Sequence, residues 1–458
     1  MSVAAEIQTT VPPLLPGGTM IMGHYGAFRE DPLRMFREAA LSGPVCRLRI
    51  GGITIYGLNA PEAVQHVLQT NYRNYRREQR VGDAVRLIAG ENLFTSDGEA
   101  WLRRRRLLQP AFHRQRIANF ATMIVRETEA LMADWPERMA RGEYVDLEQA
   151  MTRLTSQVIG RAMLSVNLER DAGDLRESFD VVSRYSIDRI MNLLTPPLLL
   201  PTAKNRSFRQ AVLTIQGALG KILAERQAMG EDEEPAGDLL DMLLAARDEE
   251  TGAGLTGDQL IAELNSIVFA GHETTATTLT FAFHLLMAHP EILAAVQSEL
   301  DEALGDRPPT LADLPALDLT RRVMLETLRM YPAAWASSRD GVEADVIAGY
   351  AIPAGARLTV NIYGIHYRPD FWPEPDRFDP DRFLPENSAE RPKLAFLPFL
   401  TGPRKCIGDE FAQLEAQLVL ATILQRYTPT LKLGHQVETA IDFVLKTKYG
   451  LPVRLQPR

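Results

Sequence analysis

The chain has 458 residues, 45% of them hydrophobic and 24% charged, so it can bury a large core and form either one large domain or two. The formal net charge of −9, with one short basic run at Arg103–Arg106, argues against an extended nucleic-acid surface. Two cysteines, Cys46 and Cys406, exclude a disulfide framework and favour a reducing setting, which predicts a cytoplasmic protein.

The N-terminal segment does not have the pattern of a signal peptide. It lacks a basic region, and prolines interrupt its apolar residues. Since no run of about 18 apolar residues occurs anywhere in the chain, we also expect no membrane span.

The predicted elements are mainly helical. Val45–Leu58 alternates apolar and polar residues around a Gly-Gly pair, which predicts a β-hairpin. Helical patterns with short connections dominate residues 60–330, and strand-like residues return at 346–362. The sequence therefore predicts a mainly α fold with a small β-rich part, at about residues 40–60 and 340–400.

One helix has clear boundaries. It begins after Thr256, where the sequence Thr-Gly-Asp-Gln has the form of a capping box, and it ends before His289 and Pro290. About 30 helical residues span roughly 45 Å, the width of a globular domain, so this helix must cross the core.

The centre of this helix, Ala270–Thr278, has the polar sequence AGHETTATT. Glycine and β-branched residues are poor helix formers, and threonine hydroxyls can bond to the preceding turn and bend the helix. Apolar residues on both sides argue against a solvated face, and a buried polar cluster is costly unless it has partners. We therefore expect this stretch to be functional.

Cys406 lies in an irregular loop, Phe399–Gly408, which contains glycine, proline and two cations. It could be a buried core residue, a nucleophile or a metal ligand. A predicted helix from about Asp409, together with Arg404 and Lys405, favours its thiolate form. A nucleophile would need a histidine base and an orienting group, which the sequence neither places nor excludes.

Among metals, iron in haem suits a single thiolate best. A zinc site would need further ligands, yet Cys406 has no second cysteine nearby and the chain has no H-E-x-x-H motif. In haem, the porphyrin supplies the equatorial ligands, so that one protein thiolate is enough.

Five residues of the loop match the pattern F-x-x-G-x-R-x-C-x-G: Phe399, Gly402, Arg404, Cys406 and Gly408. This is the signature of the cytochrome P-450 family, so the chain resembles the haem-thiolate monooxygenases. The resemblance covers residues from about 40 to 450. It implies the cytochrome P-450 fold, a single domain over residues 1–458 without a fused reductase, a long helix over haem b, and Cys406 as the axial iron ligand.

Other motifs follow in the family's order. Glu326 and Arg329 in ETLR resemble the structural E-x-x-R pair, which Arg377 in PDRF would complete. Glu273 and Thr274 in AGHETT resemble the catalytic acid and alcohol, of which the hydroxyl holds a water and the carboxylate relays protons. A simple back-bond within the helix is the alternative for Thr274.

The resemblance also assigns residues to haem binding. The expected propionate partners are Trp101, Arg105, Arg339 and Arg404. Phe399 is expected to shield the sulfur, and main-chain N–H groups around Gly408 to donate hydrogen bonds to it.

By the same resemblance, O2 and separate redox proteins drive the reaction. We expect a ferredoxin or flavodoxin with its reductase, attracted by cationic surface at Lys405 and Arg103–Arg106, unless these side chains are simply solvated. The alternatives are a peroxide-using or isomerase-type relative, which Glu273 and Thr274 disfavour, and a non-catalytic haem-binding protein.

The substrate is expected to be small and hydrophobic. Several motifs look closer to the microsomal and fatty-acid-hydroxylase branch, but the missing membrane anchor favours a bacterial enzyme. The apolar segment Asn192–Thr202 falls where the family has its substrate lid, and Gly51–Asn59 contains no cation. This favours a neutral terpenoid over a fatty acid, although Arg47 and Arg49 keep a carboxylate anchor open.

Overall fold

The computed structural model describes residues 10–167, 175–192, 195–229 and 236–458. The chain forms two compact units. The first comprises Met1–Gly82 and Leu328–Cys406, and the second comprises Asp83–Thr327 and Ile407–Arg458.

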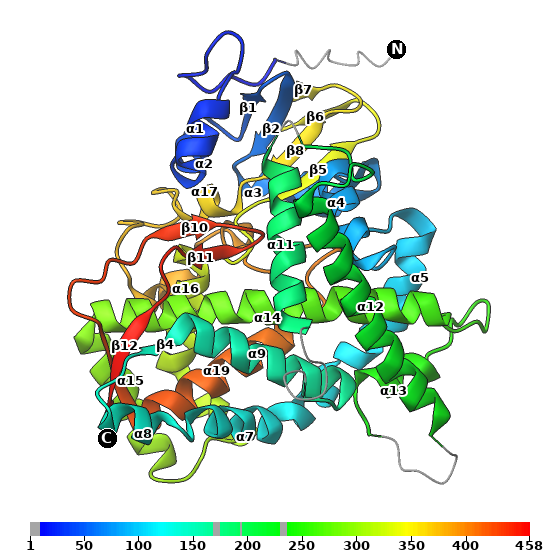
Figure 1. Cartoon of the computed structure of the whole chain (residues 1–458). Helices are drawn as coiled ribbons and strands as arrows, with labels where there is room; N and C mark the ends of the chain where they lie inside the picture. The colour runs from blue at the N-terminus through cyan, green and yellow to red at the C-terminus, as the bar shows by residue number, and fades with distance from the viewer. Residues whose placement is uncertain (1–9, 168–174, 193–194, 230–235) are drawn as a thin grey trace. The chain divides into compact units, whose positions relative to one another are not determined.

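The first unit is built on a five-stranded sheet with the order β1-β2-β8-β5-β3 (Figure 1). Its strands are β1 (Val45–Ile50), β2 (Ile53–Leu58), β3 (Tyr75–Arg77), β5 (Ser337–Gly341) and β8 (Arg357–Val360). Strands β6 (Asp345–Ile347) and β7 (Tyr350–Ile352) form a separate hairpin. The helices are α1 (Tyr25–Glu30), α2 (Pro32–Ala40), α3 (Pro61–Gln65), α17 (Ile362–His366) and α18 (Pro385–Ser388).

The predicted hairpin is confirmed. β1 and β2 pair antiparallel with Ile50 opposite Ile53, and Gly51 takes a φ of 60° in the two-residue turn, which glycine adopts at low cost. Apolar side chains of this hairpin and of β8, among them Val45, Leu58 and Leu358, are fully buried. They anchor the sheet in the core of the first unit.

Helices make up most of the second unit. They are α5 (Gly98–Leu108), α6 (Arg114–Ile117), α7 (Ala121–Met132), α8 (Trp135–Ala140), α9 (Leu147–Leu164), α11 (Leu175–Met191), α12 (Ala203–Ala228), α13 (Leu239–Ala245), α14 (Gly257–Ala288), α15 (Pro290–Leu304) and α19 (Asp409–Arg426). Two helices belong partly to each unit, α4 (Gln79–Ala89) and α16 (Asp318–Met330). The short helical segments are η1 (His66–Thr70), η2 (Tyr72–Asn74), η3 (Gln109–Phe112), η4 (Ala118–Phe120), η5 (Leu311–Ala316), η6 (Pro380–Phe383) and η7 (Lys393–Ala395).

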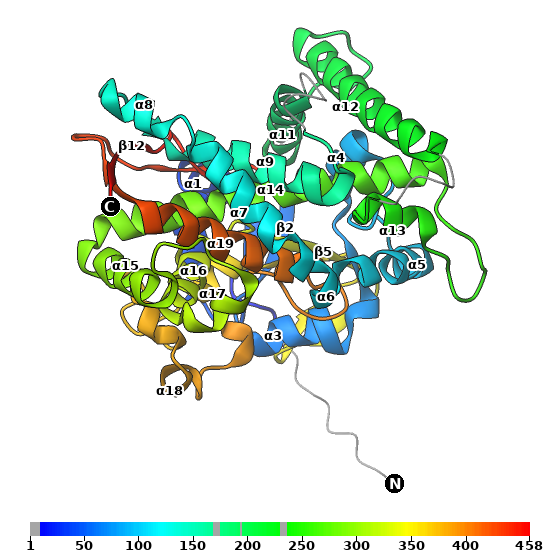
Figure 2. The same ribbon diagram turned by 90° about the horizontal axis from the view of Figure 1, so that it is seen from below.

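Helix α14 is the long helix that the sequence predicts. Its 32 residues span about 48 Å. Thr256 caps it, because its hydroxyl accepts from Gln259 N–H while the Gln259 side chain accepts from Thr256 N–H. Helices α9 and α19 pack against it, and α7 packs against α9 and α19 (Figure 2). Most residues of α14 are buried, so it forms the centre of the second unit.

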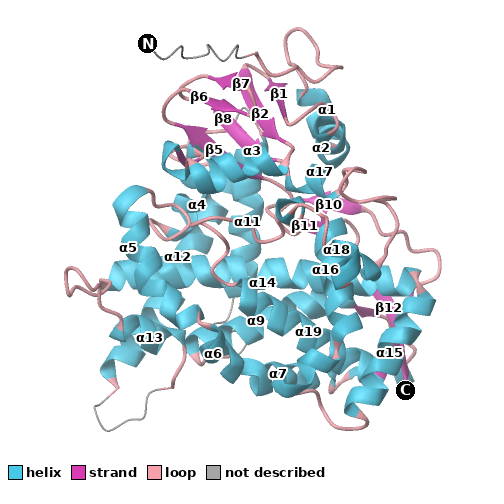
Figure 3. Ribbon diagram, turned by 180° about the vertical axis from the view of Figure 1, so that it is seen from behind, coloured by secondary structure: helices cyan, strands magenta, loops and turns pink. Residues whose placement is uncertain are grey.

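The sequence analysis missed the C-terminal strands, which Figure 3 shows in magenta. β4 (Val145–Asp146), β12 (Pro452–Pro457) and β9 (Tyr427–Leu431) form one sheet, and β10 (Thr439–Ile441) pairs with β11 (Leu445–Thr447). These strands are short, and two contain prolines, so their sequences lack a strand pattern. β11 nevertheless carries a functional candidate, Lys446.

Among the described residues, no single helix combines the length and the low charge that a membrane span requires. Helices α14 and α15 meet these requirements only when they are taken together, and the chain bends by 112° between them.

Candidate active site

The loop before Cys406 is tightly folded and presents an exposed thiol. Cys406 N–H donates to Phe399 O at 3.0 Å, and Lys405 N–H donates to Gly402 O at 3.0 Å. Leu400 and Gly402 both have positive φ, 58° and 74°. These turns fix the main chain that leads to the sulfur, which is what a ligand needs.

Gly402 lies where no side chain fits. A Cβ atom on it would stand 1.9 Å from Leu68 O in η1. The neighbouring Thr401 hydroxyl accepts a hydrogen bond from Gln69 at 2.6 Å. The loop is therefore packed directly against the main chain of η1, within the first unit.

Two cations predicted to bind haem lie in this unit. Arg339 on β5 is 2% exposed, and its Nη1 donates to Ser337 Oγ at 3.0 Å and to Ser338 O at 2.8 Å. Arg404 is half-buried in the cysteine loop. A cation buried to this degree needs an anionic or hydrogen-bonding environment, which fits a role beside a carboxylate group.

In the second unit, the polar centre of α14 is buried, so the expectation that it is not a solvated face is confirmed. The exceptions are Ala270, which is exposed, its neighbour Gly271, which is half-buried, and Thr274, which is half-buried one turn after Ala270. Ala270 and Thr274 therefore lie on one side of the helix. A surface of small residues in the middle of a buried helix fits a flat group such as a porphyrin.

The Thr274 hydroxyl donates to Ala270 O at 2.9 Å, so the back-bond is present. This bond uses the single donor of the hydroxyl and leaves its acceptor lone pairs for a water or a substrate atom.

Glu273 is held by two side chains from other elements. Its Oε1 lies 3.1 Å from Lys446 Nζ, and its Oε2 accepts from Ser183 Oγ at 3.4 Å. The carboxylate is 4% exposed, whereas the Lys446 side chain is 29% exposed. Burial lowers the pKa of Lys446, but Glu273 and Asp442 outweigh it and raise the pKa above its ordinary value. Lys446 is therefore protonated at neutral pH, and its partly exposed side chain connects Glu273 to solvent.

A second buried acid lies on α19, nine residues after Cys406 in the chain. Glu415 is 1% exposed and hydrogen-bonds to Thr275, the residue after Thr274. Burial raises its pKa well above the ordinary value, which favours the neutral form. The sequence signal for it was a single acid between apolar residues of α19.

Most arginines of the basic run on α5 bond to other residues of the chain. Arg103 donates to Gly254 O at 3.1 Å, Arg104 pairs with Glu263 at 2.6 Å, and Arg106 pairs with Glu250 at 2.5 Å. The expectation of a cationic docking surface is therefore wrong for the buried Arg104, whereas Arg103 and Arg106 are half-buried. Trp101 and Arg105 lie one turn apart on the same helix, buried and half-buried.

Glu326 and Arg329 are both fully buried on α16. Arg329 donates to His366 O at 2.9 Å and to the main-chain carbonyl of Arg377 at 3.3 Å. The prediction that the Arg377 side chain completes this group is wrong. That side chain is 64% exposed and lies 3.6 Å from Glu374.

The sequence Pro-Asp-Arg-Phe occurs twice, and the second copy supplies the better-held arginine. Arg382 is half-buried and donates to Pro373 O at 2.6 Å and to Glu374 O at 2.8 Å. These bonds close the loop around Arg377, whose carbonyl is then available to Arg329. The repeat was the signal that could have identified Arg382.

The comparisons with known proteins agree with these features. The chain matches the Cytochrome P450 family over residues 12–451. Cyclooctatin synthase of Streptomyces melanosporofaciens is 36% identical over 413 residues, 90% of this chain and 88% of that protein. Cyclooctat-9-en-7-ol 5-monooxygenase of the same organism is 35% identical over the same shares. Pentalenene oxygenase of Streptomyces avermitilis is 33% identical over 91% of both chains.

The solved structure of the cytochrome P450DA heme domain covers 98% of each chain, with a TM-score of 0.87 and 27% identity. The exposed thiol, the buried Arg339 and the small-residue surface of α14 all fit a haem with cysteine thiolate ligation. The chain therefore belongs to the cytochrome P450 family, as a haem-dependent monooxygenase.

Proposed function

We propose that this monooxygenase oxidises a neutral terpenoid, with Cys406 as the iron ligand. The names of three relatives support the substrate class, since cyclooctatin synthase, cyclooctat-9-en-7-ol 5-monooxygenase and pentalenene oxygenase match most of the chain. The overall reaction is R–H + O2 + 2e− + 2H+ → R–OH + H2O.

The contacts of Arg47 and Arg49 favour a terpenoid over a fatty acid as the substrate. Arg47 Nε donates to Pro12 O at 2.8 Å, and Arg49 Nη2 donates to Met20 O at 2.8 Å. Both candidate carboxylate anchors are thus bonded to the N-terminal segment. Of the apolar segment expected to cover the substrate, residues 193–194 lie outside the described residues, and Leu199 is 92% exposed.

The haem would be held by Cys406 and by the propionate partners Trp101, Arg105, Arg339 and Arg404. Phe399 and Gly408 remain the proposed groups around the sulfur. Bound haem supplies the redox chemistry that activates O2.

The chain's own contribution is proton delivery. Lys446 bonds to the buried Glu273 carboxylate and exchanges protons with solvent. Glu273 takes up a proton delivered through Lys446 and passes it along α14 to a water held by the Thr274 hydroxyl, which can accept a hydrogen bond while it donates to Ala270 O. Glu273 and Thr274 are thus the proposed acid and alcohol of the relay.

The enzyme needs electrons from separate redox partners. We propose a ferredoxin or flavodoxin with its reductase, in the cytoplasm. Since Arg103, Arg104 and Arg106 are bonded within the chain, the exposed Lys405 is the proposed contact for an acidic partner.

An optical titration of the ferric protein tests the substrate class. A sesquiterpene hydrocarbon should shift the iron from low to high spin, and a medium-chain fatty acid should not. A shift with the acid alone would overturn the proposal. Cys406→Ser should lose the red-shifted Soret band of the reduced carbon monoxide complex, and Thr274→Ala should lower product formed per electron consumed.

A further inference from the structure

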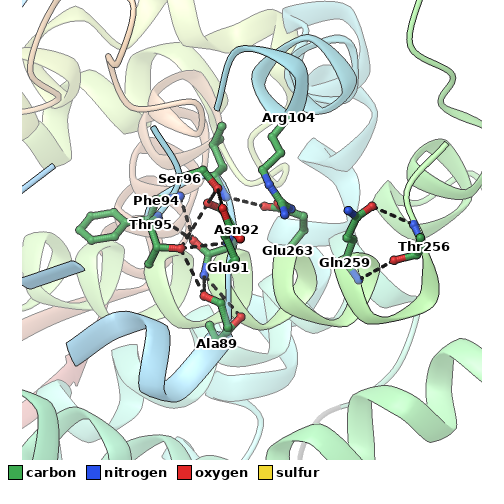
Figure 4. A network of polar contacts seen from close by, with 12 residues as sticks. Ala89, Glu91, Asn92, Phe94, Thr95, Ser96, Arg104, Thr256, Gln259 and Glu263 are labelled. Atoms are coloured by element: carbon green, nitrogen blue, oxygen red, sulfur yellow. Dashed lines mark hydrogen bonds and ion pairs between the residues drawn. The ribbon is translucent and has the colours of Figure 1, made fainter. Parts of the chain in front are cut away.

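One buried carboxylate joins three parts of the second unit. Glu263 on α14 has a side chain that is 1% exposed. Its Oε1 lies 2.6 Å from Nη1 of Arg104 on α5, whose side chain is 10% exposed. Its Oε2 accepts a hydrogen bond from the main-chain N–H of Leu93 at 3.0 Å. Figure 4 shows Arg104 and Glu263 pointing toward each other.

The loop that contains Leu93 is stiffened by its own side chains. Asn92 Oδ1 accepts from the N–H groups of Phe94 and Thr95 at 2.9 and 3.2 Å, and Ser96 Oγ donates to Asn92 O at 2.7 Å (Figure 4). Asn92 itself is 0% exposed. Because these bonds make residues 90–97 one rigid turn, the bond to Glu263 positions the whole turn and not Leu93 alone.

The other carboxylate contacts of α5 involve a more exposed arginine. Arg106, whose side chain is 37% exposed, lies 2.5 Å from the exposed Glu250 and 3.4 Å from Asp248, whose side chain is 1% exposed. In the Arg104–Glu263 pair both side chains are buried, and removing one partner of such a pair leaves the other charged and without a countercharge. The Arg104–Glu263 pair therefore ties α5 to α14.

We propose that Glu263 is a positioning residue for haem binding, acting through Arg104. Trp101 and Arg105 lie on α5 within one turn of Arg104, and the pair fixes the helix that presents them to the haem propionates. This inference rests on the proposed function of Trp101 and Arg105. Neither Glu263 nor Arg104 is itself assigned a contact with the haem.

The test measures two properties of the holoenzyme: the rate at which haem transfers to apomyoglobin, and hydrogen exchange of the amides at residues 90–97. Glu263→Gln keeps a hydrogen-bond acceptor near Leu93 but removes the charge. Arg104→Met removes the other partner. Each should speed haem loss by about tenfold and increase exchange in the turn. Arg103→Gln, next to Arg104 on the same helix, is the control and should leave both rates unchanged, because Arg103 donates to the main-chain carbonyl of Gly254.

A double variant separates positioning from general loss of stability. In Arg104→Met/Glu263→Met the pair is replaced by two apolar side chains, which cores often accept. Haem retention should recover toward wild type, while Leu93 N–H, now without its acceptor, should still exchange fast. If the effects of the two single variants simply add in the double variant, the proposal is wrong. Should Glu263→Gln not fold, Arg104→Lys, which keeps the charge, should give an intermediate rate of haem loss, and a wild-type rate would overturn the proposal.

Arg105→Gln distinguishes failure of this inference from failure of the proposed function. If Arg105→Gln speeds haem loss and Glu263→Gln does not, the positioning role is wrong and the propionate assignment stands. If Arg105→Gln has no effect, the propionate assignment fails, and with it the ground for this inference.

Discussion

Replacing Gly402 by alanine should distort the cysteine loop, and the structure gives the size of the effect. The new Cβ would stand 1.9 Å from Leu68 O, whereas carbon and oxygen atoms in contact normally lie about 3.3 Å apart. The cysteine loop or η1 must therefore move by roughly 1 Å or more. Overpacking of this kind costs about 1–3 kcal/mol, and an L-residue at this positive φ costs about 1–2 kcal/mol more.

Gly355 provides a matched control in the same unit. Its φ of 71° is close to the 74° of Gly402, but nothing lies within 4 Å of a Cβ placed on it. Gly355→Ala should therefore show only the conformational cost, about 1–2 kcal/mol. Urea unfolding of the three proteins measures the difference, and the reduced carbon monoxide spectrum reports on the thiolate ligand. Equal destabilisation by the two substitutions would refute the packing argument.

Three further predictions concern buried ionisable groups. Lys446→Met should lower kcat by roughly tenfold, because Glu273 loses its countercharge. The control Lys448→Met, which removes an exposed ion pair, should not lower kcat. Equal kcat in the two variants would argue against the relay. Burial lowers the pKa of His366 to about 3, so the unfolded chain binds a proton that the folded protein does not, and stability should fall as pH drops from about 6.5 toward 3. His366→Gln should flatten this part of a stability profile measured by urea unfolding. Because burial raises the pKa of Glu415, the stability of the protein should fall as pH rises above about 4.5. The stability of Glu415→Gln should depend less on pH in this range. An identical slope of stability against pH in the variant would show that Glu415 is not neutral.

The elements with strong local signals could be predicted from the sequence. The capping box at Thr256, the glycine turn at Gly51 and the helix from Asp409 all depend on residues within a few positions of one another. The strands β9 to β12 could not be predicted, because their short segments are stabilised by pairing across the unit and not by their own pattern.

In the candidate site, too, some residues lie in local sequence motifs and others come together only through the fold. Cys406, Glu273 and Thr274 could be proposed from the sequence because each lies in a compact motif. Lys446 is 173 residues from Glu273 in the chain, and no local pattern connects them. The Arg377 prediction failed for a local reason, since two identical tetrapeptides compete and only the fold shows which arginine is held by the main chain.

The bonds of Arg47 and Arg49 to the N-terminal segment have a consequence for engineering. Two cations on β1, Arg47 and Arg49, are the first groups to test as anchors for an acidic substrate. The change would be made around Pro12 and Met20, where altering the main-chain path would release the guanidinium groups. Substrate range would then be widened by editing a segment that contributes no catalytic residue.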